Sequence, residues 1–389
     1  GYLNSIGIVQ RHFTEDVLGH GSATVVLAGS IQIAALSLVG SPAGVACERH
    51  GYRAVLVAGC AVAMAGLLLA SFVGADNLWL LVVSHGVMLG SAAALICVPA
   101  TSIPSVWFRR HRGLANGLLM AGNGVSGLAF PPLIQMLIER VGVHWTFRIL
   151  IAVFAVLGLA PSCCIRERTA AGRPSGGSPR TTLRRAVAAV FNFPLLRNRP
   201  YLAFAAANVV CGTVFYLPYQ YVPTYATRHG STPRQAALTA VLIGVGQIAG
   251  GLGGGIMIDG IGVFNTLVAM QLLSTVSTAA VWAVGQRFGV LALFCVLYGA
   301  SSCGTLYLTI SPLVAALFDV AQVPSAIGLV YVAFGVGELA MLGAYSPLED
   351  VDPVDMRAII ALCGAMNLGG LVLCMVSRWL VSPRIAARV

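Results

Sequence analysis

Long apolar stretches separated by short polar segments dominate this sequence. Eleven stretches of 17 or more residues contain no Asp, Glu or Arg, apart from one Glu in the tenth. A helix of about 20 apolar residues crosses a bilayer core about 30 Å thick. We therefore expect eleven membrane-spanning helices, over residues 17–47, 54–75, 77–108, 113–138, 149–165, 200–227, 235–258, 260–286, 288–318, 320–348 and 358–377.

The beginning of the chain predicts a further, incomplete helix. The first residue is Gly1 rather than Met, and residues 1–9 are mostly apolar or small. We expect the sequence to be a fragment that begins partway through a first helix. A complete first helix would raise the number of spans to twelve.

Composition supports a membrane protein over a soluble one. The chain is 58% hydrophobic and 9% charged, whereas soluble domains contain roughly 25% charged residues. All 23 basic residues are Arg, which gives a net charge of +10. They occur in short clusters between apolar runs and form no basic stripe interleaved with aromatic residues, so nucleic-acid binding is not expected. The predicted class is an all-α membrane protein.

One hydrophilic segment divides the chain into two similar parts. Residues 166–199 are rich in Gly, Pro, Ser and Arg, which predicts a cytoplasmic linker between a helical half at 1–165 and another at 200–389. Parallel repeats joined in this way are typical of one large class of transporters. A constant offset of 211 residues pairs Gly44, Glu48, Gly51, Gly117, Gly124 and Leu128 with Gly255, Asp259, Gly262, Gly328, Gly335 and Leu339.

The distribution of Arg residues predicts the orientation. Cytoplasmic loops retain an excess of basic residues. If the incomplete first helix exits outward, sixteen of the 23 Arg residues lie on the inner side and seven on the outer side. This arrangement places the C-terminus in the cytoplasm.

Two helix starts carry specific capping signals. Thr232 can cap a helix that begins at Pro233, with Gln235 completing a capping box. Asp352 and Pro353 give a similar signal for the last span.

A charged motif links two spans on the predicted cytoplasmic side. The segment "GVACERHGYRAVL" has the pattern G-x-x-x-E-R-x-G-x-R. A Gly at its start allows two helices to approach, a second Gly turns the chain, and the acid can pair with Arg. Its residues are Gly44, Glu48, Arg49, Gly51 and Arg53.

The motif has a second copy in the other half. "GIMIDGIG" retains Gly255, Asp259 and Gly262 but contains no Arg. The first copy resembles the loop between helices two and three of the major facilitator superfamily. That resemblance implies a fold of two six-helix halves, and it assigns Glu48, Arg49 and Arg53 to a latch on the cytoplasmic gate.

A finer resemblance points to the monocarboxylate-transporter-like branch of that superfamily, especially its fungal members. The similar segments are "RRHRGLANGLLMAGNGVSGLAFPPL", "FYLPYQYVPTYA" and "GYLNSIGIVQRHF". In animal monocarboxylate carriers the eighth helix holds an Asp and, four residues later, an Arg. The corresponding positions here are Gln247 and Gly251, so proton-coupled monocarboxylate transport does not follow directly.

The stretch "GNGVSG" has the glycine spacing of a dinucleotide-binding loop. Such a loop needs a preceding strand and an acid about 20 residues further on, but here an Arg cluster and an apolar helix surround the glycines. Small residues spaced three and four apart instead predict a helix-packing face. This face consists of Gly113, Gly117, Ala121, Gly124 and Gly127. No nucleotide, other cofactor or metal is expected.

Polar residues inside the spans are the candidates for a substrate or proton pathway. An ionisable group costs about 2.5 to 3.5 kcal/mol on insertion scales, and in a span it is a functional candidate. Glu338 is the only acid deep in a stretch, and His85 is the only such His, whose reference pKa near neutrality suits proton transfer. Neutral hydrogen-bonding candidates are Asn208, Tyr216, Tyr219, Gln220 and Gln247.

Each pathway candidate also has a structural interpretation. Glu338 can be hydrogen-bonded between helices, His85 can anchor its helix at the membrane surface, and the neutral groups can hold helices together.

The sequence therefore predicts a secondary transporter rather than an enzyme. It would move a small organic solute, monocarboxylate-like or related, by alternating access coupled to an ion such as the proton. The ATP-binding G-x-x-x-x-G-K-[ST] loop does not occur in the sequence. Alternatives are an efflux carrier for a secondary metabolite or drug, a sensor on the same fold, and a membrane oxidoreductase. The expected location is the plasma membrane.

Overall fold

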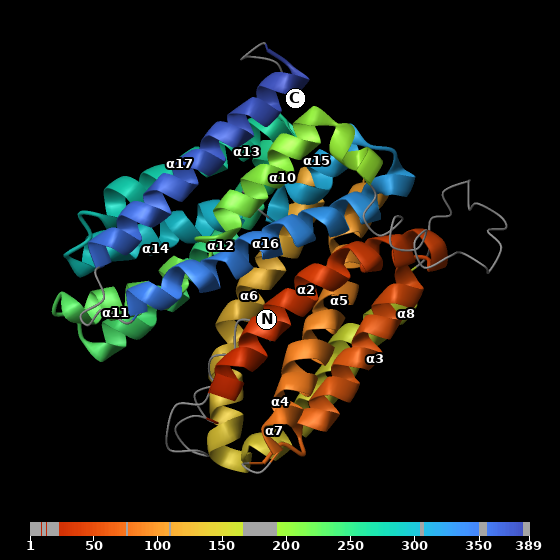
Figure 1. Cartoon of the computed structure of the whole chain (residues 1–389), viewed down its shortest axis with the longest axis vertical. Coiled ribbons are helices and arrows are strands. Elements are labelled where there is room, and N and C mark those ends of the chain that lie inside the picture. Colours follow the sequence, from red (N-terminus) through yellow and green to blue (C-terminus); the bar gives the residue numbers. More distant parts are fainter. Residues whose placement is uncertain are drawn as a thin grey trace. The chain divides into compact units, whose positions relative to one another are not determined.

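The computed structural model describes Val9, Phe13 and residues 23–74, 77–108, 110–165, 193–303, 307–349 and 356–383. Within these residues every regular element is helical (Figure 1), which confirms the predicted all-α class. Ten of the helices are long and apolar enough to cross a membrane. Residues 166–192 of the predicted linker, and residues 1–8 of the predicted incomplete helix, lie outside the described residues.

Five spanning helices precede the linker in the part of the chain that the structure describes. Two of them contain π-helical segments, η4 and η5. The elements are α2 (Ala23–His50), α3 (Tyr52–Ala70), α4 (Trp79–Leu81) continuing through η4 (Val82–Leu89) into α5 (Gly90–Trp107), α6 (Arg112–Val141), and α7 (Val143–Phe154) continuing through η5 (Ala155–Leu159) into α8 (Ala160–Cys164).

The helices after the linker follow the predicted spans. In the predicted stretch 288–318 the structure gives α14 (Phe288–Cys303) and α15 (Ile310–Leu317), and residues 304–306 lie outside the described residues. The other elements are η6 (Phe193–Arg197), α10 (Arg199–Gly212), α11 (Leu217–Arg228), α12 (Pro233–Ile261), α13 (Val263–Val276), the π-helical η7 (Ser277–Trp282), η9 (Val320–Gln322), α16 (Val323–Glu349) and α17 (Met356–Val381).

The start of α12 confirms the predicted capping box. The Gln235 N–H donates to Thr232 Oγ1 at 3.3 Å, and the Thr232 N–H donates to Gln235 Oε1 at 2.9 Å. Pro233 is the first residue of the helix. The equivalent signal at Asp352 lies outside the described residues.

The structure divides into two compact units that do not coincide with the predicted repeat boundaries. The first unit takes in Gly1–Ile103, Ala129–Phe193 and Phe318–Val332. Its core gathers apolar side chains from several helices, including Leu67, Ile134, Phe147 and Leu150, all at most 1% exposed. The first ten residues of α16 therefore belong with elements of the preceding half.

The second unit consists of Pro104–Leu128, Pro194–Leu317 and Ala333–Val389. Its core contains a run of stacked rings, with Trp282 and Phe294 centroids 5.0 Å apart and Phe294 and Tyr298 centroids 5.6 Å apart. Within this unit α17 packs against both α10 and α13.

The glycine face of α6 lies against α12 inside the second unit. A Cβ built on Gly117 would lie 3.2 Å from Gly255 Cα, and one built on Gly124 would lie 2.8 Å from Ile248 Cγ1. Side chains larger than hydrogen therefore do not fit at these positions without movement of α12.

The "GNGVSG" stretch is part of this continuous helix. The preceding element is helix α5 rather than a strand, and α6 runs for 30 residues through the motif. Ala121 is buried on the contact face and Gly127 is half-buried. The motif thus lies in a spanning helix and has no geometry of a nucleotide loop.

Two glycines of this stretch provide a matched test of packing. We expect Gly124→Leu to lower the stability of the purified protein by about 1 to 3 kcal/mol, the usual cost of overpacking. Gly122→Leu is the control, because a Cβ at that position would have no described heavy atom within 4 Å apart from its chain neighbours and the backbone of its own helix. Thermal unfolding of both variants measures the difference, and equal unfolding midpoints would contradict this account of the α6 contact.

Candidate functional site

The first candidate site is the place where α2 crosses the start of α16, inside the first unit. A Cβ built on Gly40 would lie 3.1 Å from Gly328 O, and one built on Gly44 would lie 2.7 Å from Ser325 Cα. The two helices therefore pack backbone against backbone, as small residues allow in membrane proteins.

A second crossing of the same kind lies inside the second unit, where α12 meets the start of α6. A Cβ built on Gly251 would lie 3.0 Å from Gly117 O, and one built on Gly255 would lie 2.7 Å from Gly113 O. Here too, glycine permits a contact that no other residue would allow.

The two crossings are related by the offset that aligns the halves of the sequence. If 211 is added to the number of an α2 residue and subtracted from the number of its α16 partner, each contact of the first crossing becomes a contact of the second. Gly40 with Gly328 corresponds to Gly251 with Gly117, and Gly44 with Pro324 corresponds to Gly255 with Gly113. The repeat is therefore visible in the helix contacts as well as in the sequence.

An acidic side chain caps a helix at the second crossing. Asp259 Oδ1 accepts a hydrogen bond from the Gly113 N–H at 2.8 Å, and its Oδ2 accepts one from the Leu114 N–H at 2.9 Å. These amides belong to the first turn of α6, where backbone N–H groups have no partner within the helix. The negative charge also suits the positive end of the helix dipole. A residue of α12 thus stabilises the start of α6.

The equivalent acid at the first crossing faces the corresponding turn of its partner helix. Glu48 faces the backbone and hydroxyl of Ser325, the third residue of α16, just as Leu114 is the third residue of α6. Within the described residues, however, Glu48 Oε1 and Ser325 Oγ have no hydrogen-bond partner. The sequence explains part of this difference, because Pro324 occupies the position of Gly113 and has no N–H to donate.

The remaining residues of the charged motif surround these acids. Gly51 and Gly262 have φ values of 89° and 93°, a backbone conformation that strongly favours glycine, at the turns into α3 and α13. Arg49 and Arg53 are exposed, and Arg49 is close enough to Glu48 to attract its carboxylate electrostatically.

A second candidate region is an aromatic and polar cluster in the second unit. Gln247 Nε2 donates a hydrogen bond to Tyr219 OH at 2.7 Å. The ring of Phe215 contacts four other rings at centroid distances of 4.9 to 5.9 Å, and these belong to Tyr216, Tyr219, Tyr307 and Phe334. Gln220, in contrast, is exposed.

The cluster surrounds a break in a spanning helix. Residues 213–216 form a turn between α10 and α11, and Pro218 in the first turn of α11 lacks the N–H that a continuous helix needs. Tyr298 OH donates to the carbonyl of Phe215 at 2.8 Å and so satisfies a backbone group at the break. Broken helices often line binding sites in transporters.

Two buried polar groups lie on neighbouring helices in the same unit. Glu338 on α16 is 4% exposed and Asn208 on α10 is 1% exposed. Among the described residues, Glu338 Oε2 and Asn208 Oδ1 have no hydrogen-bond partner. The helices touch nearby, since a Cβ on Gly337 would lie 3.0 Å from the amide nitrogen of Thr213.

His85 belongs to the first unit. It is part of the π-helical segment η4 and is 1% exposed. Its Nδ1 is 3.4 Å from Ser84 Oγ, and its ring makes an edge contact with Phe147 at 5.3 Å. This burial argues against a surface anchor. The structure does not bring His85 and Glu338 together within one compact unit.

Several residues of these sites were not anticipated from the sequence. Gly40 and Pro324 can be found from the sequence by applying the 211-residue offset to positions outside the charged motif. A break within the seventh span is signalled by Pro218. The contacts of Tyr298 and Phe334 with Phe215 have no local sequence signal, because these residues lie far apart in the chain.

The fold and the repeated crossings define a multi-pass helical membrane protein. The sequence profile of the Major Facilitator Superfamily matches residues 5–337. The chain belongs to that superfamily. It is therefore a transporter and not an enzyme, and an integral membrane protein.

Similar proteins support this assignment. The MFS-type transporter pynF of Aspergillus niger is 26% identical over 385 residues, covering 99% of this chain and 86% of that protein. The Fujikurins efflux protein of Gibberella fujikuroi is 25% identical over 388 residues, covering 99% and 80%. The fucose:proton symporter of E. coli has a similar fold, with a TM-score of 0.72, 14% identity, and coverage of 97% of this chain and 95% of that one.

The cap on α6 gives a direct prediction. We expect Asp259→Asn to accelerate amide hydrogen exchange at residues 113–117 roughly fivefold, since a helix cap contributes about 1 kcal/mol. Glu139→Gln is the control, because Glu139 lies at the exposed other end of α6, where it accepts a hydrogen bond from Gln135 Nε2 at 2.6 Å. Unchanged exchange in the Asp259 variant would show that the carboxylate does not hold this turn.

Proposed function

We propose that the protein is a secondary transporter that moves a small organic solute by alternating access. The observation that supports this most strongly is the pair of repeat-related crossings at α2 with α16 and α12 with α6. Each crossing depends on glycine contacts and on one acid facing the start of a partner helix. Such contacts can separate and re-form without unfolding either helix, as a gate requires.

In this proposal the charged motif acts as the cytoplasmic gate. Asp259 and Glu48 hold the starts of α6 and α16 when the gate is closed. Arg49 and Arg53 attract the Glu48 carboxylate when it is released, while Gly51 and Gly262 keep the turns short. The excess of Arg on one side supports a cytoplasmic position for this gate and for the C-terminus, and the plasma membrane is the proposed location.

The aromatic and polar cluster is the proposed contribution of the second unit to solute binding. Tyr219 and Gln247 supply neutral hydrogen-bonding groups, and Phe215, Tyr307 and Phe334 supply ring faces. This combination suits a monocarboxylate-like or related organic metabolite with an apolar body. Gln247 and Gly251 stand where animal monocarboxylate carriers have an Asp and an Arg, so recognition would rely on neutral hydrogen bonds.

Efflux of a secondary metabolite is a second candidate. The named function of the Fujikurins efflux protein favours it, because that relative aligns with 99% of this chain. The ring-rich cluster also suits a larger apolar product. Reconstituted vesicles distinguish transport in either direction from a sensor that moves no solute.

We propose that Glu338 carries the coupling proton, because it is a buried acid with one carboxylate oxygen unpartnered within the described residues. Proton coupling is also consistent with the named activity of the fucose:proton symporter. When the protein only exchanges solute across the membrane, no net proton moves, so this exchange would not require Glu338 to carry a proton.

Glu338→Gln tests that role in proteoliposomes. With the solute that the unsubstituted protein accumulates, chosen from short monocarboxylates and aromatic metabolites, we expect loss of uptake driven by a pH gradient and retention of solute exchange. Glu139→Gln should retain both activities. Undiminished uptake that still depends on the pH gradient in Glu338→Gln would rule out the proposed role.

The gate is tested with a native cysteine. Cys47 adjoins Glu48 on α2 and is 4% exposed, whereas Cys163 and Cys164 are exposed. We expect Glu48→Gln to raise maleimide labelling of Cys47 several-fold, because loss of the charge favours separation of the crossing. Labelling is quantified by peptide mass spectrometry with Cys163 and Cys164 as internal references. Equal Cys47 labelling in both proteins would contradict a latch at Glu48.

A further inference from the structure

Two buried oxygen atoms of the second unit have no hydrogen-bond partner among the described residues. They are Oε2 of Glu338 on α16 and Oδ1 of Asn208 on α10, and both residues are at most 4% exposed. The proposed transport function uses Glu338 as the carrier of the coupling proton and leaves Asn208 without a role. The packing of α10 against α16 relates these two oxygens to each other.

The α10 and α16 helices pack backbone against backbone in antiparallel directions. A Cβ built on Gly212 would lie 2.6 Å from Phe334 O, and a Cβ built on Gly337 would lie closer still to Val209 O. All of these residues belong to the second unit. Moving three residues back along α10, from Gly212 to Val209, therefore corresponds to moving three residues forward along α16.

The same register places Asn208 opposite Glu338. Each lies one residue beyond the second of these contacts, in the direction that the register requires. Asn208 also lies four residues before Gly212, and Glu338 lies four residues after Phe334. Residues four apart share one face of a helix. Both side chains therefore project from the helix faces that meet at this contact.

The Asn208 amide is oriented so that its oxygen is the atom without a partner. Its Nδ2 donates to Phe204 O, within the same helix, at 2.9 Å. A reversed amide would bring two oxygens together, so this bond assigns the nitrogen and the oxygen. An amide oxygen and an ionised carboxylate can both only accept hydrogen bonds. An ionised Glu338 would therefore leave two buried acceptors facing each other, which is unfavourable.

A proton on Glu338 satisfies both oxygens at once. A protonated carboxyl has one O–H donor, and Asn208 Oδ1 is the acceptor opposite it. One proton thus replaces two unsatisfied acceptors by one hydrogen bond between α10 and α16.

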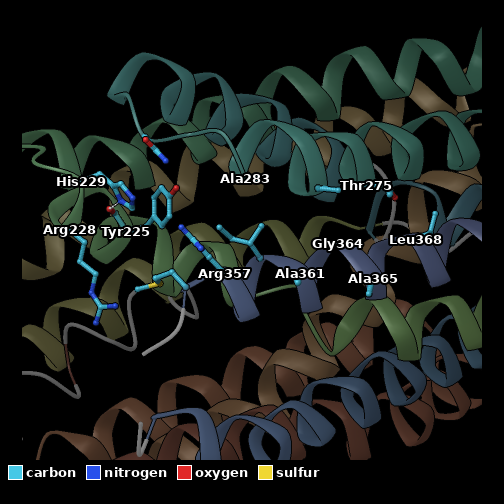
Figure 2. Close-up of a pocket in the computed structure, with 14 residues that line it drawn as sticks. Tyr225, Arg228, His229, Thr275, Ala283, Arg357, Ala361, Gly364, Ala365 and Leu368 are labelled. Atoms are coloured by element: carbon cyan, nitrogen blue, oxygen red, sulfur yellow. Dashed lines mark hydrogen bonds between the residues drawn. The ribbon is translucent and has the colours of Figure 1, made fainter. Parts of the chain in front are cut away.

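A bridging water is a poorer solution at this position. A buried water needs its own volume and about two to four polar partners. The cavity of about 1100 Å³ in this unit lies between the end of α11, the α13 and η7 helix, and α17 (Figure 2), and neither Asn208 nor Glu338 lines it. Only one residue away from the pair, the backbones of α10 and α16 are in contact.

The surroundings of this acid in the described residues are uncharged. Residues 200–212 of α10 contain no Asp, Glu, Arg or His, and residues 323–341 of α16 contain no charged residue besides the acid itself. The titratable groups packed around Phe334 are Cys211, Tyr216, Tyr219 and Tyr307. Thiols and phenols are largely neutral at about pH 7. Hence none of these groups supplies a charge that would pair with the carboxylate.

We propose that Asn208 holds the coupling proton on Glu338, with the protonated carboxyl donating from Oε2 to Asn208 Oδ1. This assignment rests on the proposed role of Glu338 as proton carrier and adds a positioning residue on α10. Loss of the proton replaces the hydrogen bond by repulsion between two acceptors. Because α10 ends at the helix break before α11, the charge state of Glu338 acts on the segment that leads into the proposed solute site.

Infrared difference spectroscopy of the purified full chain in lipid tests this bond without any solute. The carbonyl stretch of a protonated carboxyl moves to lower wavenumber as the group gains hydrogen bonds. We expect a carboxyl band in acidic minus alkaline spectra that disappears in Glu338→Gln. Asn208→Leu has a similar volume but no acceptor, so it should move this band to higher wavenumber. A purely structural role of Asn208 would not move it.

Matched variants control for changes in packing. Thr213→Val removes a hydroxyl at the same helix contact, but this hydroxyl donates to Val209 O of its own helix at 3.1 Å, so the band should stay in place. Asn208→Val and Asn208→Thr form a second pair of equal shape. The Thr variant retains an oxygen acceptor and the Val variant does not, so only the Val variant should give the higher wavenumber.

The outcomes separate this bond from the role of Glu338 as proton carrier. An unchanged band in Asn208→Leu and Asn208→Val, each eluting as a folded protein, would overturn the assignment of Asn208 and leave Glu338 as the carrier. If the unsubstituted protein and Glu338→Gln gave identical carboxyl spectra, Glu338 would take up no proton and both proposals would fail. Loss of the band when sodium replaces choline at constant pH would assign the two oxygens to a sodium ion instead.

Discussion

The backbone N–H groups in the first turn of a helix have no partner within that helix and need one from elsewhere. Where the turn packs against another helix, a buried group left unsatisfied costs about 1 to 3 kcal/mol. In this transporter the acid of one helix supplies the partner for the start of another. Asp259 of α12 accepts from two amides of α6, and Glu48 of α2 faces the start of α16. The packing of these helices follows from this requirement.

The same requirement accounts for other features of the second unit. Where Pro218 interrupts a spanning helix, Tyr298 OH satisfies the carbonyl of Phe215. Where α13 meets α17, Asn367 accepts hydrogen bonds from Gln271 and Ser274. Polar side chains thus appear where the backbone is broken or where helices need a fixed contact. Aromatic rings and small residues pack around these polar side chains and shape the cavities next to them.

Much of the fold was predictable from the sequence because its signals are local. Apolar length located the spans, and the capping box at Thr232 gave the start of α12 to the residue. The break at residues 213–216 was different, since apolar length alone does not reveal that α10 ends before α11 begins. Residues 166–192 of the linker between the predicted halves lie outside the described residues, so that division stays a prediction.

The sites were less predictable because they depend on contacts between distant segments. The motif pattern identified Glu48 and Asp259, but not the helix starts that they face. Those partners become apparent only when the repeat is combined with the helix crossings. Glu338 and His85 stood out as ionisable residues in apolar stretches, yet sequence could not show that they lie in different units. The aromatic contacts around Phe215 likewise need the tertiary fold.

One difference within the repeat changes the backbone donors that the two crossings offer. Gly113 donates its N–H to Asp259, whereas its counterpart Pro324 has no hydrogen to donate. Asp259 therefore meets two successive amides at the start of its partner helix, and Glu48 meets one fewer. If the two crossings form the gate proposed above, the same repeated acid has unequal numbers of backbone hydrogen bonds to break at its two positions.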